Sequence, residues 1–97
     1  MPIMVVVEGK AKKEAVDRMK ATLKKGFKET RAYDGCMSIN AYTLDDDGQT
    51  FLFVQHWETK PHYERYLAWR TETGFVAELV NMLESGPSIR FFQQLDA

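Results

Sequence analysis

The sequence predicts an α+β fold of the ferredoxin-like type, with a four-stranded antiparallel sheet and both helices on one of its faces. Segments with the two-residue period of strands alternate with segments of helical period, in the order β-α-β-β-α-β. Two right-handed βαβ units joined in this way give such a sheet. The length of 97 residues corresponds to one domain, residues 1–97.

The first strand and the first helix are marked by a change of period. Residues 3–7 form an apolar run rich in β-branched side chains, which indicates a strand covered on both faces, closed by residues 8–10. From Ala11 to about Arg31 an apolar stripe recurs at helical spacing and lysines fill the other side. The stripe consists of Ala15, Val16, Met19, Leu23, Phe27 and Thr30. Gly26 lies beside this stripe. Because glycine lowers helix stability, its presence suggests that another element packs closely on the helix at this position.

A hairpin follows a turn at residues 33–35. Residues 36–44 and 50–57 alternate as strands, and the acidic, Gly-containing segment 45–49 connects them. In the first strand Met37, Ile39 and Ala41 share one face, and Ser38, Asn40 and Tyr42 share the other. In the second strand one face carries Phe51, Phe53, Gln55 and Trp57.

The second helical region has a cap, an interruption and an end. Thr59 can cap the helix, and Pro61 is tolerated in the first turn. The inner stripe is predicted to be Tyr63, Tyr66, Leu67 and Arg70. After a break at residues 73–74, a second helical piece has Phe75, Val76, Leu79, Val80 and Leu83 on its inner face. Residues 85–87 are expected to end it, and residues 88–95 to form the last strand.

The composition is that of a folded soluble protein, with 44% hydrophobic and 28% charged residues. A net charge of -1 gives no reason to expect a nucleic-acid partner. The basic residues of segment 10–31 are interpreted as the solvated face of a helix, and a phosphate or membrane contact is the alternative. No membrane span or signal peptide is expected. The single cysteine, Cys36, fits a reducing compartment, so we expect a cytoplasmic protein.

Both sides of the hairpin strands carry apolar or aromatic residues, whereas helices can cover only one side of the sheet. The other side would expose a large apolar patch, which soluble monomers rarely do. A second copy of the sheet with two-fold symmetry is the simplest cover. We therefore expect a homodimer that forms through the sheet face.

Motifs for metal or nucleophilic chemistry are weak. His56, His62 and Cys36 are the only soft ligands and lack the spacing of a metal motif, so no metal site is predicted. The acidic residues 45–47 lack the spacing of a calcium loop. No glycine-rich loop precedes a helix, which argues against a nucleotide phosphate site.

The informative group is aromatic. Trp57 ends a strand, and Tyr63, Tyr66 and Trp69 follow on the next helix. Such rings between a sheet and a helix can line a pocket for a flat aromatic small molecule, with nearby polar groups fixing its oxygens. The polar candidates are Asn40, Tyr42, Gln55 and Arg70. The alternative, which composition alone favours, is that these rings are ordinary core residues.

The strand end Gln55-His56-Trp57-Glu58 and the helix start that follows resemble the strand–Trp–helix signature of antibiotic-biosynthesis monooxygenase domains. Asp34-Gly35-Cys36 is similar to the family's turn into its second strand, and the resemblance covers residues 3–95. It implies a dimeric α+β barrel. It also implies oxygenase chemistry without metal, flavin or haem, in which a deprotonated aromatic substrate reduces O₂ inside a dry pocket.

The chain departs from characterised branches of this family. Tyr66 stands where many quinol-type members have a histidine, the side chain best suited to proton transfer near neutral pH. Val7 and Leu79 stand where the haem-degrading branch has its Asn and His, so we do not expect haem binding of that kind. Trp57 and Tyr63 match the anthrone-oxygenase set, but Phe53 replaces its Asn and no Arg aligns, although Arg70 could substitute in space.

These residues lead to one main hypothesis and two alternatives. The main hypothesis is a cofactor-independent monooxygenase acting on a quinol-like or polycyclic phenolic compound, with no cofactor. Its catalytic candidates are Tyr66 and, if it reaches the pocket, His62 as the base; its substrate-binding candidates are Trp57, Tyr63, Trp69, Asn40 and Arg70. The alternatives are a non-catalytic binding dimer with the same pocket, and an isomerase or decarboxylase of related barrel type.

Overall fold

Four strands form one antiparallel sheet: β1 (Ile3–Ala11), β2 (Cys36–Thr43), β3 (Thr50–Trp57) and β4 (Leu83–Gln93). Their order in the sheet is β2-β3-β1-β4, so the first strand lies in the interior between β3 and β4. The structure is a computed structural model and describes residues 2–97. It confirms the predicted ferredoxin-like β-α-β-β-α-β fold.

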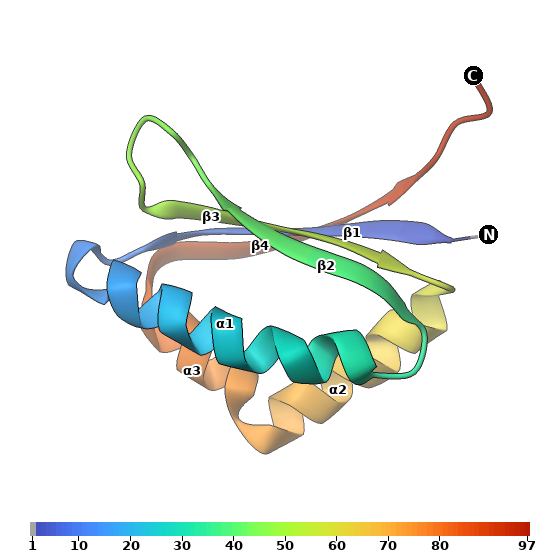
Figure 1. Ribbon diagram of the computed structural model, residues 1–97, viewed down its shortest axis with the longest axis horizontal. Coiled ribbons are helices and arrows are strands. Elements are labelled where there is room, and N and C mark those ends of the chain that lie inside the picture. Colours follow the sequence, from blue (N-terminus) through green and yellow to red (C-terminus); the bar gives the residue numbers. More distant parts are fainter. Residues whose placement is uncertain (1) are drawn as a thin grey trace.

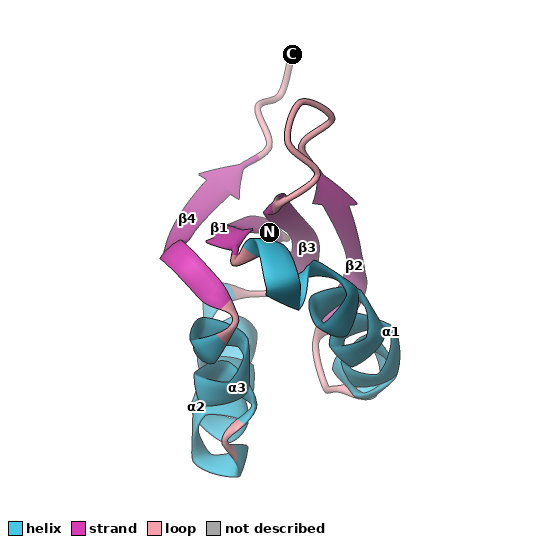
Figure 2. Ribbon diagram, turned by 90° about the vertical axis from the view of Figure 1, so that its left-hand side faces the viewer, coloured by secondary structure: helices cyan, strands magenta, loops and turns pink. Residues whose placement is uncertain are grey.

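The helices α1 (Val16–Ala32), α2 (Lys60–Thr73) and α3 (Phe75–Asn81) lie on the same face of the sheet (Figure 1). A short 3₁₀ helix (Lys13–Ala15) leads into α1. Figure 2 shows that α1 runs beneath β2, whereas α2 and α3 run beneath β4. The sheet and the two helical arms therefore surround an interior that both arms and the sheet line.

Local sequence explains the helix ends. The hydroxyl oxygen of Thr59 accepts the backbone N–H of His62 at 3.3 Å, which confirms Thr59 as the cap of α2. Gly74 has φ 86°, a left-handed conformation that ends α2 and separates it from α3. In α1 the predicted stripe is the buried one, including Met19, Leu23, Phe27 and Thr30.

The helix-facing side of β3 is almost fully buried. Phe51 is 3% exposed, Phe53 9%, Gln55 3% and Trp57 0%. The first two pack with α1 side chains such as Met19 and Phe27. Trp57 instead packs with β1 and α2. The interior therefore consists of an aliphatic–aromatic part under α1 and a second, ring-rich part under α2.

Several predicted boundaries were wrong. β1 continues to Ala11 instead of stopping at residues 8–10, because Gly9 and Lys10 pair with Phe51 and Thr50 of β3. The second helical region ends at Asn81, and Leu83 already belongs to β4. Residues 85–87, expected to end a helix, lie inside this strand, and the strand stops at Gln93 instead of residue 95.

The reason is an irregular pairing of β1 with β4. Ala11 pairs with Leu83 and Lys10 with Ser85, and the register then shifts before Glu8 pairs with Ser88. Gly86 lies in this shifted segment with φ 88°, and a Cβ there would come within 2.9 Å of the carbonyl oxygen of Glu8. In a sequence, a Gly-Pro pair usually predicts the end of a helix or strand, but here it forms a bulge within a strand.

The opposite face of the sheet carries no helix within residues 2–97 (Figure 1). The register places on it apolar, polar and charged side chains: Met4, Val6, Glu8, Asn40, Tyr42, Leu52, Val54, His56, Arg90 and Phe92. We call this set the open face. Tyr42 is 55% exposed and Phe92 40%, so large rings meet solvent here.

None of the helices in the described part of the chain is both long and apolar enough to span a bilayer.

Candidate functional site

The structure brings three of the predicted aromatic residues together. Trp57 at the end of β3 lies against Tyr66 and Tyr63 of α2, with ring centroids 4.9 Å and 5.7 Å apart. Trp57 is fully buried, Tyr63 is 2% exposed and Tyr66 6%. These rings are therefore core residues of the ring-rich part of the interior, and any ligand would have to meet them from inside the protein.

Trp69 joins this group through a residue that sequence reasoning missed. Tyr33 stacks on Trp69, with centroids 5.2 Å apart and planes at 25°, and lies 5.3 Å from the ring of Tyr66. The sequence places Tyr33 only in the turn before β2. No pattern in the sequence marks it, because it follows the last turn of α1 and leaves the helical stripe.

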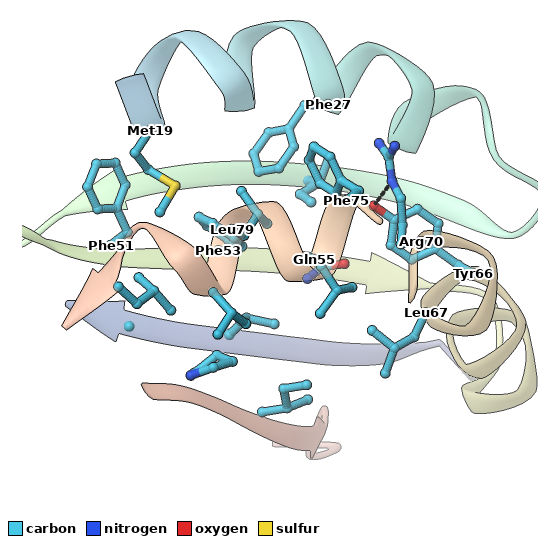
Figure 3. A pocket seen from close by; sticks show the side chains of 18 of the residues that line it. Met19, Phe27, Phe51, Phe53, Gln55, Tyr66, Leu67, Arg70, Phe75 and Leu79 are labelled. Atoms are coloured by element: carbon cyan, nitrogen blue, oxygen red, sulfur yellow. Dashed lines mark hydrogen bonds between the residues drawn. The ribbon is translucent and has the colours of Figure 1, made fainter. Parts of the chain in front are cut away.

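A cavity of about 90 Å³ lies between the sheet and the helices (Figure 3). Its walls are nearly all apolar and come from all three α-helices and every strand of the sheet. Four of the lining residues carry polar groups: Gln55, Tyr63, Tyr66 and Arg70. Pockets for drug-sized ligands usually measure about 300–1,000 Å³. A polycyclic ligand would therefore require the side chains of the cavity wall to move. A small flat molecule would require a smaller movement of these side chains.

Arg70 is 4% exposed, and its guanidinium group is engaged with the protein itself. Nε donates to the hydroxyl oxygen of Tyr66 at 2.9 Å, as Figure 3 shows. One terminal nitrogen donates to the carbonyl of Gly26 at 2.6 Å and to the hydroxyl of Thr30 at 3.1 Å, and the other approaches Glu29 at 3.3 Å. Arg70 thereby ties α2 to α1 and leaves little donor capacity for a ligand.

Tyr66 belongs to the same hydrogen-bonded chain. Its hydroxyl lies 2.7 Å from that of Thr30, which in turn donates to the carbonyl of Gly26 at 3.3 Å. Since the hydroxyl of Thr30 gives its only proton to the carbonyl of Gly26, the hydroxyl of Tyr66 donates to Thr30 and accepts from Arg70. The ring of Tyr66 lines the cavity, while its polar atom serves the contact between the helices.

Gln55 and Tyr63 differ from Arg70 because they keep free polar atoms. The indole N–H of Trp57 donates to Oε1 of Gln55 at 3.0 Å. No group within residues 2–97 accepts from Nε2 of Gln55, and the hydroxyl of Tyr63 likewise lacks a protein partner there. Burial, together with the neighbouring Tyr66, raises the pKa of Tyr63 to about 12, so its hydroxyl stays protonated at neutral pH.

His62 does not reach the cavity and is not among its lining residues. Its Nδ1 lies 2.6 Å from the hydroxyl of Thr59 and its Nε2 3.7 Å from a carboxylate oxygen of Asp34. A Cβ at Gly35, whose φ is 89°, would collide with the imidazole ring, so the turn before β2 packs directly on His62. The geometry therefore does not meet the condition under which His62 was considered as a base.

Asp34, Glu58 and His62 are the side chains in the described part of the chain that could hold a metal ion, with ligand atoms within 4.8 Å of one another. Both carboxylates are exposed. The group also lies at the N-terminal end of α2, where the helix dipole disfavours a cation. It is a weak candidate.

Asn40 lies on the open face. It pairs with Val54 of β3, whose side chain points away from the helices, and it is exposed to solvent. The expectation that Asn40 orients ligand oxygens next to Trp57 is therefore incompatible with the geometry. The alternation of the strand already indicates this position, because Asn40 follows the core residue Ile39 and neighbouring residues of a strand point to opposite faces.

Comparison with known proteins gives a family and a fold. The family model for antibiotic biosynthesis monooxygenase matches residues 2–78. No curated protein matches the sequence. A conserved protein from Methanosarcina mazei is similar in structure with a TM-score of 0.89 at 17% identity, covering 98% of this chain and 94% of that one. A Mycobacterium tuberculosis protein is similar with a TM-score of 0.87 at 20% identity, covering 100% and 98%. At these identities the structural likeness concerns the fold alone.

Proposed function

Because the chain belongs to the antibiotic biosynthesis monooxygenase family, we propose that it is a cofactor-independent monooxygenase that oxidises a quinol-like or polycyclic phenolic small molecule with O₂. The observation that carries the proposal is the cavity between sheet and helices. It combines apolar walls and aromatic neighbours with the free polar atoms of Gln55 and Tyr63. That combination suits a flat, mostly apolar substrate with one or two oxygens.

The proposed reaction follows from the chemistry of an anthrone-like substrate. Loss of one proton gives an electron-rich enolate or phenolate, which passes an electron to O₂. Recombination of the resulting radicals forms a C–O bond at the ring carbon opposite the substrate oxygen. The CH₂ group at that carbon becomes a carbonyl, one oxygen atom is retained and the other leaves as water, so the substrate supplies all four electrons.

The protein's contribution would be to favour the anion and exclude water. In a low-dielectric cavity, N–H and O–H donors stabilise a developing oxyanion more strongly than in water. Gln55 and Tyr63 have unengaged donors next to the cavity. Tyr66 contributes a ring wall and is held by Arg70, which acts as a positioning residue in this proposal. Trp57 holds Gln55 through its indole N–H and packs against the ring of Tyr66. His62 is assigned no proton transfer.

Oxygen uptake tests the proposal. The purified protein, treated with a chelator, is assayed with a panel of quinols and anthrones, and autoxidation is subtracted. We expect catalysed uptake with at least one substrate, retained in the presence of the chelator. Leu79→Trp, which fills the cavity, should abolish uptake. Ala77→Trp, at an exposed position of the same helix, should leave it unchanged. Absence of uptake above background with every substrate would contradict the proposal.

A second candidate function is a non-catalytic binding protein with the same cavity. It is favoured by the engagement of Arg70 and Tyr66 in internal hydrogen bonds, and by the absence of histidine and carboxylate side chains from the described cavity walls. A binding protein would show a ligand-dependent rise of Tm without any oxygen consumption. Thermal shift and oxygen uptake on the same compounds distinguish the two functions.

We further propose that the open face forms a homodimer interface. Rings and aliphatic side chains gather on it, Tyr42 and Phe92 are about half exposed, and helices occupy only the other face. Light scattering should give the mass of a dimer. Val54→Asp in the middle of this face should shift it toward monomer, whereas Ala68→Asp, exposed on α2, should not. A monomeric wild-type protein would refute this assembly.

A further inference from the structure

Gln55 combines three properties that rarely occur together in a core residue. It is 3% exposed, it lies among apolar cavity walls, and half of its amide group lacks a protein partner. More than about nine in ten buried polar groups in proteins are hydrogen-bonded. An amide that only served to satisfy the indole of Trp57 would need its oxygen alone, so its nitrogen calls for a separate explanation.

The orientation of the amide is fixed by chemistry. The indole N–H of Trp57 is a donor only, so the atom it contacts at 3.0 Å must be the acceptor Oε1. Rotation of the amide by 180° would set two donors against each other. Nε2, with two N–H donors, must therefore occupy the other position. Trp57, fully buried beneath α2, thus acts as an anchor that keeps Nε2 in place.

The free nitrogen faces the cavity. Within residues 2–97, every fully enclosed side-chain nitrogen or oxygen has a hydrogen-bond partner, so Nε2, which has none, must touch open space. Gln55 lines the cavity, which is the space beside it. Figure 3 shows the amide of Gln55 at this wall, between Phe53 and Leu67, among apolar side chains.

We propose that Gln55 is a specificity-determining residue whose amide N–H groups bind the acceptor oxygen of a flat, apolar ligand, either a ring carbonyl or a phenolate. Donors without a nearby acceptor select for an acceptor, and a ligand that lacks one leaves the amide unpaired in an apolar site. The uncharged amide also allows a neutral ketone to bind. The inference rests on the proposed function only for the location of the ligand, and it does not require that oxygen be consumed.

The test uses two probes of similar size that differ in one oxygen. 1-Indanone has a ring carbonyl and no hydroxyl, and indane is the matching hydrocarbon; neither is expected to consume oxygen. Binding is followed by ¹H–¹⁵N NMR titration of the wild-type protein and of Gln55→Leu. We expect Gln55→Leu to weaken 1-indanone binding at least about five-fold, the value of one hydrogen bond, and to leave indane binding unchanged or tighter.

A measurement on the wild-type protein makes the test independent of how well the variant folds. The side-chain amide signals of Gln55 should shift on addition of 1-indanone and stay in place with indane. Trp57→Phe, which releases Oε1, should reduce the preference for 1-indanone. Equal effects of Gln55→Leu on both probes, unshifted amide signals, or no binding of either probe would each overturn the inference. Specific 1-indanone binding without oxygen uptake from any phenol would retain it and refute the oxygenase proposal.

Discussion

Phe75 of α3 lies directly on the backbone of Gly26 in α1: a Cβ built on Gly26 would be 2.6 Å from Cζ of the phenylalanine ring. The guanidinium of Arg70 also contacts this ring, with its Cζ 4.0 Å from the ring centroid. The ring is therefore packed against both a helix backbone and a cation. Since α3 has no fully buried residue, this contact is a main anchor of the helix on the rest of the protein.

We predict that Gly26→Ala destabilises the protein despite the higher helix propensity of alanine. The propensity gain is about 1 kcal/mol, and displacement of a packed ring costs about 1–3 kcal/mol. In a Phe75→Leu background the clash is removed, so Gly26→Ala should there increase the free energy of unfolding. Urea denaturation of the four proteins measures this coupling. If Gly26→Ala changed the free energy of unfolding equally in both backgrounds, the contact with the Phe75 ring would not be the cause of the destabilisation.

Arg70→Met should reduce the free energy of unfolding by about 3–5 kcal/mol, because it removes the charge-assisted hydrogen bonds to the carbonyl of Gly26 and to the hydroxyls of Tyr66 and Thr30. Arg70→Lys should recover only part of this loss, since an ammonium group cannot reproduce the fork of donors. Glu29 is the matched control. Its side chain is 61% exposed, so Glu29→Gln should cost less than about 1 kcal/mol. If Glu29→Gln lowered the free energy of unfolding as much as Arg70→Met, the ion pair with Glu29 would be the main contribution of Arg70 to stability.

Tyr63 should make the protein sensitive to alkaline pH. The unfolded chain releases the phenolic proton near the ordinary pKa of 10, whereas burial raises the pKa in the folded protein to about 12. Between these values the unfolded state binds fewer protons, so the free energy of unfolding falls as pH rises, by up to about 1.4 kcal/mol per pH unit from this group. Denaturation at pH 9 and pH 11 should show a steeper decline for wild type than for Tyr63→Phe. Parallel declines would contradict the burial argument.

Cys36 should react slowly with thiol reagents. Burial raises the pKa of its thiol, and the nearby charge of Arg31 opposes that shift without cancelling it. The thiolate is the reactive form, so less of it is present in the folded protein. Reaction with Ellman's reagent at pH 8 should be at least about ten-fold slower than in urea. Arg31→Met should slow it further, and faster reaction of the variant would contradict the assignment.

The sequence was most informative where one face of an element is buried and the other is wet. The stripe of α1 from Met19 to Thr30 and the alternation of Phe51, Phe53, Gln55 and Trp57 were predicted correctly, because burial enforces these periods. The shift between β1 and β4 was not predictable. It depends on pairing between segments far apart in the chain, where local turn signals are overruled by tertiary contacts.

The sequence predicted which aromatic rings meet, but not how the polar groups around them are engaged. Trp57, Tyr63 and Tyr66 meet as expected, because they end one strand and follow the inner stripe of the next helix. The sequence cannot show that Arg70 is engaged by α1, or that His62 packs on Gly35, because both contacts depend on how separate elements approach each other. For the same reason Gln55 could be noticed as a polar residue, but its free nitrogen could not.

The position of β1 between β3 and β4 has a consequence for synthesis on the ribosome. Ile3–Ala11 is made before both of its partners, because one of its edges pairs with Thr50–Trp57 and the other with Leu83–Gln93. Both pairings close long loops, which slows folding. Until Leu83–Gln93 has emerged, an apolar strand edge stays unpaired on the nascent chain. This edge is where we expect a chaperone, or a neighbouring nascent chain, to bind first.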